Sequence, residues 1–303
     1  MDASAQEETI NTDNWAQEEL GKADFGDKRL VKRFIQITSD IAAQPEASIP
    51  QACGSEAASK AAYRFLDNEN VTPDAVRASH RDKTVERVKE YKEVLAIQDT
   101  TSLNYAAHKA TSGLGPIDGN GTNGFHVHSV LAVSSDGIPL GLVHQQTWAR
   151  DPKEKGKKEK RKKLPIEEKE SYRWLQSLEA TKQAMSEETH IITITDREGD
   201  IFELFALERP SNIDLTIRAV QNRRVKVDDA DIRKLWDSIK SVPVANQTMT
   251  IHLEHKPGKP ARDVNLHLRW KTISIMPPIN KSKKYVPVSF TAICRSTDRR
   301  RTA

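Results

Sequence analysis

Residues 94–99 of this 303-residue chain read Val-Leu-Ala-Ile-Gln-Asp, and residues 191–196 read Ile-Ile-Thr-Ile-Thr-Asp. Each stretch is a short apolar run of the kind that forms a buried strand, and each ends at an aspartate, Asp99 or Asp196. The pattern predicts further strands at 127–133, 140–144 and 213–219, with a Ser-Asp-Gly turn at 135–137. It predicts helices at 166–185 and 200–207.

The order of these elements decides the fold class. From Val94 onward it is strand, strand, strand, helix, strand, helix, strand, which is the order of an RNase H-like core without its last helix. The prediction is therefore an α/β protein with a mixed sheet in which the first and fourth strands lie side by side. Beyond Arg224, residues 249–253, 264–270 and 286–293 alternate as half-exposed strands do. We expect an inserted antiparallel β-region there.

The chain upstream of the sheet is expected to be all helical. After Asp27, a residue that can cap a helix, four apolar residues recur at helical spacing: Leu30, Phe34, Ile37 and Ile41. Further helices are expected from Ser55 to Leu66 and from Thr72-Pro73 onward. Four basic residues fall outside the apolar stripe and form a positive face: Lys28, Arg29, Lys32 and Arg33. Taken alone, that face is what any solvated helix shows.

These patterns predict five segments. We expect a disordered amino terminus at 1–14, a helical domain at 15–91, a partial RNase H-like core at 92–222, the inserted β-region at 223–294 and a basic tail at 295–303. Residues 153–163 hold eight basic and two acidic residues, and they are expected to form a surface loop.

Composition narrows the class of protein only moderately. The net charge is +4 and the pI is 8.9, values that permit a polyanionic partner without requiring one. Cys53 and Cys294 lie far apart and share no metal-ligand spacing, so neither a disulfide framework nor a zinc knuckle is expected. The sequence shows no apolar run of membrane-spanning length and no basic start followed by an apolar run. We therefore expect a cytoplasmic protein without a membrane partner.

The two aspartates offer the clearest chemistry. If the strands before Asp99 and Asp196 are neighbours, their carboxylates converge and can hold a divalent metal ion. Oxygen ligands suit Mg²⁺ or Mn²⁺, and two such ions can activate a water or a 3′-hydroxyl against a phosphodiester. The alternative is that each aspartate only caps the turn after its strand.

The local sequences resemble a known family. Residues 97–102 (Ile-Gln-Asp-Thr-Thr-Ser) and 193–199 (Thr-Ile-Thr-Asp-Arg-Glu-Gly) are similar to the motifs around the first two acidic ligands of the insertion-sequence-four family of cut-and-paste transposases, which includes the transposon-five type. Other stretches follow in family order: Phe25 to Arg29, Gly54 to Ala58, Ala62 to Phe65, His128 to Leu131, Gly141 to Gln145, Glu170-Ser171 and Trp174-Leu175. The resemblance covers about residues 15–295.

The resemblance implies a role for each matching position. Asp99 and Asp196 would be the first two catalytic metal ligands, with Mg²⁺ or Mn²⁺ as the cofactor. The partner would be double-stranded DNA, the inverted-repeat ends of a transposon, which implies a place at the nucleoid. Basic groups would grip DNA phosphates and fix the register of binding. The candidates for DNA binding are Lys28, Arg29, Lys32, Arg33, Lys60, Tyr63, Arg64 and Arg218.

The sequence departs from the family at its carboxyl end. The family pattern has a third carboxylate, a glutamate in a Tyr-Arg-Glu-Lys signature on a helix after the β-region, and this sequence contains no such signature. The family acts as a dimer on DNA, and its dimerisation region is also missing here. We therefore expect an incomplete copy whose 303 residues do not cut DNA.

Three functions remain open at this point. The first is a DNA transposase of the type that uses two aspartates and a glutamate. The second is a non-catalytic remnant that binds transposon ends without cutting them. The third, a stand-alone RNase H-like nuclease, needs another nearby carboxylate, for which Glu198 and Asp200 are the candidates.

Four aromatic or imidazole side chains invite other readings. His126 and His128 lie two apart on one strand and share a face, but no third ligand with suitable spacing accompanies them, which disfavours zinc. Trp148 and Trp270 can stack on a displaced base, although large aromatic residues belong more often to a core or an interface.

Overall fold

The computed structural model describes residues 14–118, 121–154, 157, 163–228, 231–246 and 248–297. Three predicted features lie wholly or largely outside these residues: the disordered amino terminus, most of the basic loop at 153–163 and the end of the basic tail. The described chain forms two compact units. The first is drawn from Met1–Lys163, Gln176–Ile194 and Arg209–Thr216, and the second from Leu164–Leu175, Thr195–Glu208 and Ile217–Ala303.

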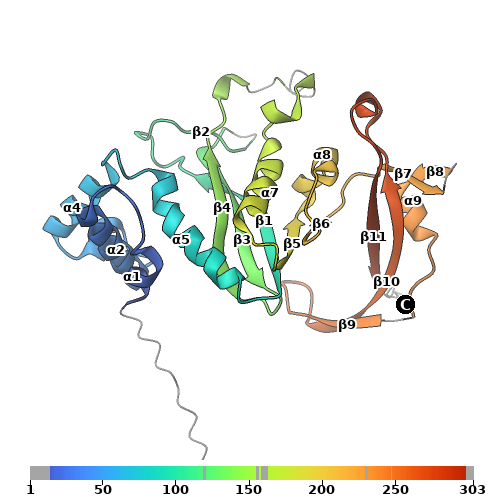
Figure 1. The fold of residues 1–303 in the computed structure, drawn as a ribbon, viewed down its shortest axis with the longest axis horizontal. Helices are drawn as coiled ribbons and strands as arrows, with labels where there is room; N and C mark the ends of the chain where they lie inside the picture. Colours follow the sequence, from blue (N-terminus) through green and yellow to red (C-terminus); the bar gives the residue numbers. More distant parts are fainter. Residues whose placement is uncertain are drawn as a thin grey trace, which may run out of the picture. The chain divides into compact units, whose positions relative to one another are not determined.

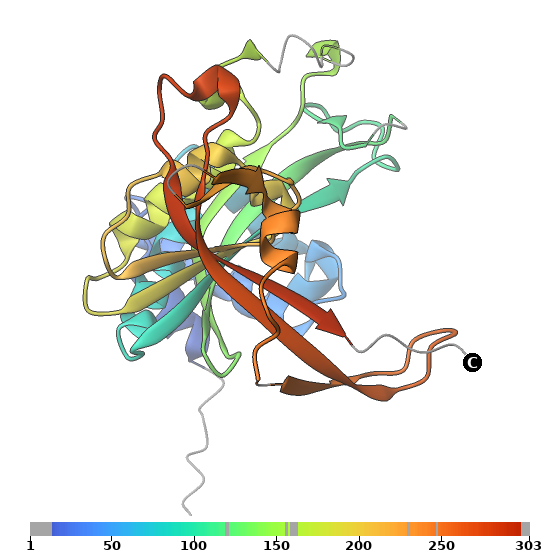
Figure 2. The same cartoon turned by 90° about the vertical axis from the view of Figure 1, so that its right-hand side faces the viewer.

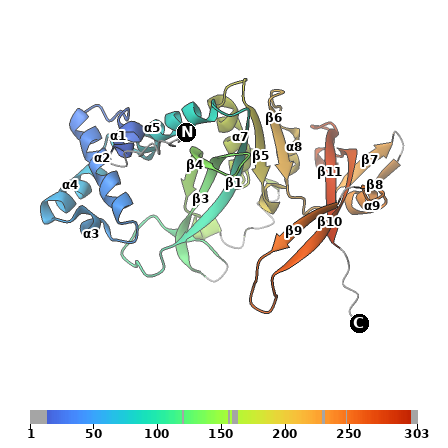
Figure 3. The same ribbon diagram turned by 90° about the horizontal axis from the view of Figure 1, so that it is seen from below.

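The amino-terminal part of the first unit is helical, as predicted (Figure 3). Its helices are α1 (Trp15–Leu20), α2 (Lys28–Ala43), α3 (Ile49–Cys53), α4 (Glu56–Leu66) and α5 (Pro73–Val88). The three predicted starts are confirmed, because Asp27, Ser55 and Thr72 each accept a hydrogen bond from a backbone N–H of the first turn. The sequence analysis missed α1 and α3, which are too short to show a helical period.

Three phenylalanine rings form the centre of this helical part. The rings of Phe25 and Phe34 meet edge to face at 5.4 Å between centroids, and those of Phe34 and Phe65 stack at 5.8 Å. The predicted stripe on α2 holds at Phe34 and Ile37, both buried. It fails at Ile41, which is 38% exposed, because the last turn of α2 extends beyond the core that α4 supplies.

A polar network joins α1, α5 and the strand β4 (Pro139–Trp148) within this unit. Arg87 donates to both carboxylate oxygens of Glu19, at 2.7 and 2.9 Å, and to the backbone carbonyl of Leu140 at 2.6 Å. The backbone N–H of Leu142 donates to His80 Nε2, so the other ring nitrogen, Nδ1, carries the proton that is shared with Glu19. The network fixes the first helix of the module to the sheet.

The six strands of the larger sheet are β1 (Glu93–Asn104), β2 (Gly115–Pro116), β3 (Asn123–Ser134), β4, β5 (His190–Thr195) and β6 (Ile213–Ile217). Their order is β2-β3-β1-β5-β6. Strand β4 also pairs with β3, on the same edge as β2 but further along the strand. The pairs β1–β3 and β3–β4 are antiparallel. The predicted neighbourhood of the first and fourth main strands, β1 and β5, is therefore found.

Backbone hydrogen bonds at the strand starts fix the direction of the last two strands. The N–H of His190 donates to the carbonyl of Lys92, just before β1, and the N–H of Ile191 donates to the carbonyl of Asn212, just before β6. The strands β1, β5 and β6 therefore begin at the same edge, and the sheet is mixed.

The two helices predicted after β4 and after β5 are present, with shorter bounds. The helix predicted at 166–185 is a 3₁₀ turn (Ile166–Glu168) followed by α7 (Tyr172–Ala184). The helix predicted at 200–207 is a 3₁₀ turn (Arg197–Gly199) followed by α8 (Phe202–Ala206). A third 3₁₀ turn lies at Pro152–Glu154. Figure 1 shows α5 running along β4, with which it packs.

The second sheet is antiparallel throughout, as predicted for the β-region (Figure 2). Its order is β11-β10-β7-β8, with β9 paired to β10. Its elements are β7 (Arg224–Asp228), β8 (Asp231–Lys234), α9 (Leu235–Lys240), β9 (Thr248–Leu253), β10 (Arg262–Ile275), a 3₁₀ turn (Ile279–Lys281) and β11 (Val288–Thr297). The sequence analysis did not predict β7, β8 or α9.

The second unit has its own apolar core, made of Phe202, Phe205, Val225, Leu235, Ile273 and Ile275. No helix in the described part of the chain is long and apolar enough to cross a lipid bilayer.

Candidate nucleic-acid interface and acidic positions

The positive face predicted on α2 is present. Lys28, Arg29 and Lys32 are exposed, and Arg33 is half-buried. Lys28 and Lys32 lie on the side of the helix opposite Phe34, whereas Arg33 lies one turn before Ile37, at the flank of the buried side. Arg29 differs from the other three because its guanidinium binds Asp27, with Nη2 at 2.7 Å from Oδ2. The hydrogen bonds from Arg29 lower the pKa of Asp27. Among the described residues, Lys28, Lys32 and Arg33 have no ion-pair partner.

The candidates on α4 form a second group. Lys60, Tyr63 and Arg64 point away from Ala62 and Phe65, the buried side of this helix. Lys60 is tied to Glu56 at 2.7 Å, whereas Arg64 is exposed and Tyr63 is 47% exposed. Only part of this group is therefore open to a ligand.

The α2 group and the α4 group are separate. Both face away from the core in which Phe34 stacks on Phe65, so they lie on outer sides of two packed helices. No hydrogen bond or ion pair joins the groups within the part of the chain that the structure describes.

The distribution of charge along the chain shows a second concentration of cations, which was not predicted from the sequence. Residues 15–71 hold seven basic and nine acidic side chains, so any phosphate contact there depends on the local α2 face. Residues 218–297 hold sixteen basic and six acidic side chains, although the whole chain carries only +4. Counting charge by segment rather than over the chain would have found this concentration.

The cations of this basic β-region are largely at the surface. Nine are exposed: Arg218, Arg233, Lys234, Lys240, Lys256, Lys259, Lys283, Lys284 and Arg295. Others are occupied inside the protein, such as Arg269, which donates to the Val242 carbonyl and the Ser296 hydroxyl, and Lys281, which pairs with Glu203.

Asp99 and Asp196 are both exposed at the ends of the expected stretches. Asp99 lies on β1, where its Cα partner on β3 is Ser129, and its carboxylate has no hydrogen-bond partner among the described residues. Asp196 directly follows β5, and its Oδ1 accepts the backbone N–H of Glu198 at 2.8 Å. Each carboxylate therefore keeps at least one oxygen for another ligand.

The structure assigns different partners to the two acidic residues that a stand-alone nuclease would need. Glu198 is bound to Arg173 at 2.5 Å, although its side chain is 62% exposed. Asp200 is buried, and both its oxygens are occupied by Val220, Gln221 and Arg223. No group of three His, Cys, Asp or Glu side chains suited to a metal ion occurs among the described residues.

Arg218 lies where the resemblance implied. It is exposed and directly follows β6, and its backbone N–H donates to the carbonyl of Thr195 at 3.1 Å. Thr195 is the residue before Asp196, so Arg218 is tied by its backbone to the start of the acidic segment.

The two histidines and Trp148 are covered by neighbouring side chains, whereas Trp270 is exposed. His128 is fully buried and bonded to Thr100 and Gln98, and His126 is buried against Ser102, which makes both core residues rather than zinc ligands. Trp148 stacks on His126 at 5.2 Å, so its ring is already covered. Trp270 remains 51% exposed on β10, opposite Ile293.

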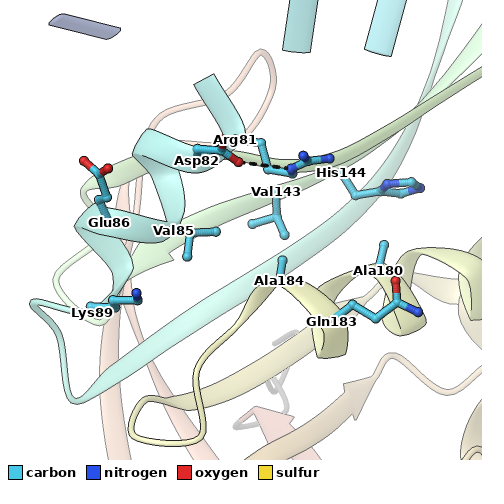
Figure 4. Close-up of a pocket in the computed structure, with 10 residues that line it drawn as sticks. All are labelled: Arg81, Asp82, Val85, Glu86, Lys89, Val143, His144, Ala180, Gln183 and Ala184. Atoms are coloured by element: carbon cyan, nitrogen blue, oxygen red, sulfur yellow. Dashed lines mark ion pairs between the residues drawn. The ribbon is translucent and has the colours of Figure 1, made fainter. Parts of the chain in front are cut away.

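A cleft of about 650 Å³ between α5, β4 and α7 contains none of the predicted site residues (Figure 4). Its walls mix charges, with Arg81 and Lys89 against Asp82 and Glu86. Burial lowers the pKa of His144 on its floor, and the charges of Arg77 and Arg81 lower it further, so this imidazole is neutral at neutral pH. The mixed walls do not make the cleft a polyanion site.

Comparison with known proteins identifies the helical part. Residues 12–71 match a protein family described as "Transposase DNA-binding". This segment includes α1 to α4 and every predicted DNA-binding residue except Arg218. These helices are therefore similar to the DNA-binding segments of transposases.

A solved structure is also similar to the chain, a cryo-EM structure of a piggyBac transposase synaptic complex with hairpin DNA. The likeness covers 94% of this chain and 57% of that chain, at 10% sequence identity and a TM-score of 0.31. The chain therefore spans little more than half the length of that protein, and at this score the likeness carries no argument about function.

Proposed function

We propose that this chain is a DNA transposase polypeptide of the insertion-sequence-four type, and that it binds transposon ends through its amino-terminal helices. The observation that carries the proposal is the match of residues 12–71 to transposase DNA-binding segments. Helix α2 of this segment presents cations that have no ion-pair partner among the described residues. Cations on one face of a helix suit the regularly spaced phosphates of duplex DNA. The exposed basic residues of the β-region supply a second surface for the same backbone.

The proposal includes an RNase H-like core that carries Asp99 and Asp196. Support comes from the strand order and from the shared starting edge of β1 and β5. The backbone hydrogen bond from His190 to Lys92 joins the starts of β5 and β1. Asp99 lies seven residues beyond Lys92, and Asp196 lies six residues beyond His190. Counted from this hydrogen bond, the two aspartates come at corresponding positions along the chain.

The two carboxylates offer the oxygen donors that Mg²⁺ or Mn²⁺ prefers, but two carboxylates are too few to complete the coordination of such an ion. Both are exposed and offer free oxygens, the donor type these ions prefer. When bound, the metal would supply charge neutralisation for phosphoryl transfer. The part of the two aspartates would be to hold the ion. Arg218, whose backbone N–H donates to the carbonyl of Thr195 next to Asp196, would bind a DNA phosphate nearby. An ion held by two carboxylates takes its other ligands from water and DNA, so we expect weak binding.

A second function, DNA binding without cleavage, is favoured by a specific observation. The described residues contain no third carboxylate grouped with the first two, and Glu198 and Asp200 are engaged elsewhere. In phosphoryl transfer, loss of one charge-stabilising group commonly costs about 3–4 kcal/mol of transition-state stabilisation. A polypeptide of this kind would occupy DNA ends and leave them intact.

Binding and nicking assays on the same protein separate these functions. Binding is followed by fluorescence anisotropy with a labelled random-sequence duplex, and cleavage by nicking of a supercoiled plasmid in Mn²⁺. Salt-sensitive binding with nicking that Asp99→Ala and Asp196→Ala abolish would support the transposase. Salt-sensitive binding without nicking would support the non-catalytic binder. Absence of salt-sensitive binding would refute both.

A further inference from the structure

Asp200 is a buried carboxylate that is not one of the proposed metal ligands. Its side chain is 1% exposed. Oδ2 accepts the backbone N–H groups of Val220 at 2.7 Å and Gln221 at 2.6 Å, and Oδ1 accepts Nε and Nη2 of Arg223 at 2.9 and 2.6 Å. A carboxylate that accepts four hydrogen bonds has no oxygen left for a metal ion.

Arg223 completes the arrangement from the other side. Its side chain is 13% exposed, and the same Nη2 also donates to the backbone carbonyl of Asp200 at 2.5 Å. Its guanidinium lies over the ring of Phe205, 5.5 Å from the centroid. The charge of Asp200 is thus matched by one arginine in a fixed fork geometry.

These contacts join two segments of the second unit at both ends. At one end the N–H of Arg218 donates to the carbonyl of Thr195, and at the other Asp200 holds Val220, Gln221 and Arg223. Between Thr195 and Asp200 lies Asp196, whose carboxylate caps the turn Arg197–Gly199. Segment 195–200 and segment 218–223 therefore form a backbone clamp that carries Asp196 on one side and Arg218 on the other.

We propose that Asp200 is a positioning residue, which through this clamp holds Arg218 in place to bind a DNA phosphate beside Asp196. The inference rests on the proposed function. In it Asp200 fixes the conformation of segment 218–223 and does not bind a metal ion. A buried acid that anchors two consecutive backbone amides restricts the chain more than a surface loop residue does. An arginine on a restrained loop loses less conformational entropy when it binds a phosphate.

The test uses the full chain and four variants, with binding of the random-sequence duplex measured across a range of salt. Arg218→Ala should make the salt dependence shallower by about one unit of slope, the loss of one phosphate contact. Asp200→Asn should do the same, because its neutral amide removes the negative charge opposite Arg223 and offers one acceptor oxygen instead of two, which weakens the clamp. The double variant should be no weaker than either single variant. Glu198→Gln is the matched control, an exposed arginine-paired acid two residues away, and it should leave the slope unchanged.

Hydrogen exchange provides the second readout. In Asp200→Asn the amides of Val220 and Gln221 should exchange faster than in the wild type, while those of α2 should not. If Asp200→Asn fails to fold, Arg223→Lys replaces it, since it keeps the charge and loses the fork.

Additive losses in the double variant, or a wild-type slope in Asp200→Asn, would overturn the inference while leaving the proposed function intact. An unchanged slope in Arg218→Ala would also overturn it. A wild-type protein without salt-dependent DNA binding would instead refute the proposed function itself.

Discussion

Removal of the three unpaired cations from α2 should flatten the salt dependence of DNA binding. The variant Lys28→Ala/Lys32→Ala/Arg33→Ala deletes the three basic side chains of α2 that no described acidic residue engages. Each Lys or Arg on a phosphate contributes about 0.9 to the slope of log affinity against log salt, so three contacts contribute about 2.7. Between 50 and 200 mM salt, that difference corresponds to an about 40-fold change in the ratio of wild-type to variant affinity.

The assay is anisotropy titration of a labelled duplex at several salt concentrations. Lys22→Ala is the matched control, because Lys22 is an exposed lysine of the same helical part that is already paired with Glu86 at 3.3 Å. Arg29→Ala should change the slope less than Lys32→Ala, since Arg29 must leave Asp27 before it can bind a phosphate. A triple variant with the wild-type slope would refute the assignment of the DNA contacts to α2.

Three other changes test further parts of the structure. Lys256→Ala/Lys259→Ala should lower the salt slope by about 2 if the β-region binds DNA, by the same titration. Phe65→Ala should destabilise the helical part by about 3–5 kcal/mol in urea unfolding, because it empties the centre of the phenylalanine cluster. Arg87→Ala should cost about 2 kcal/mol in the same assay, since it leaves the carboxylate of Glu19, 17% exposed, without its cation. Burial raises the pKa of Glu19, but Arg87 and His80 outweigh burial, so this pKa lies below its ordinary value of 4.5. The stabilisation that ionised Glu19 contributes is therefore present above pH 4.5 and is lost as the pH falls through the lowered pKa.

Local signals in the sequence predicted much of the fold. The caps Asp27, Ser55 and Thr72 act within three residues of where they stand, so sequence alone shows where their helices begin. The alternation of buried residues along β1 and the apolar run of β5 are equally local. Short elements escaped prediction because α3, for example, spans only five residues and is defined by its packing on α4.

The candidate site was less predictable because charge acts through partners. Sequence placed Arg29 and Lys60 among free DNA contacts, whereas the structure pairs them with Asp27 and Glu56. The basic surface of the β-region follows from composition alone and was missed because the net charge of the whole chain conceals it. Which of its cations are exposed depends on the register of β9, β10 and β11, and no short motif encodes that.

The contrast between Asp196 and Asp200 shows why tertiary context decides the role of an acidic residue. The two stand four residues apart in one polar segment, and a reading of the sequence alone treats both as candidate ligands. Asp196 ends a strand and remains exposed, so its free oxygen can meet a ligand from solution. Asp200 faces Arg223 and two backbone N–H groups that come from beyond β6, about twenty residues away. Because a buried carboxylate is tolerated only when such donors satisfy it, the distant segment 218–223 determines that Asp200 shapes the site while Asp196 is left to act in it.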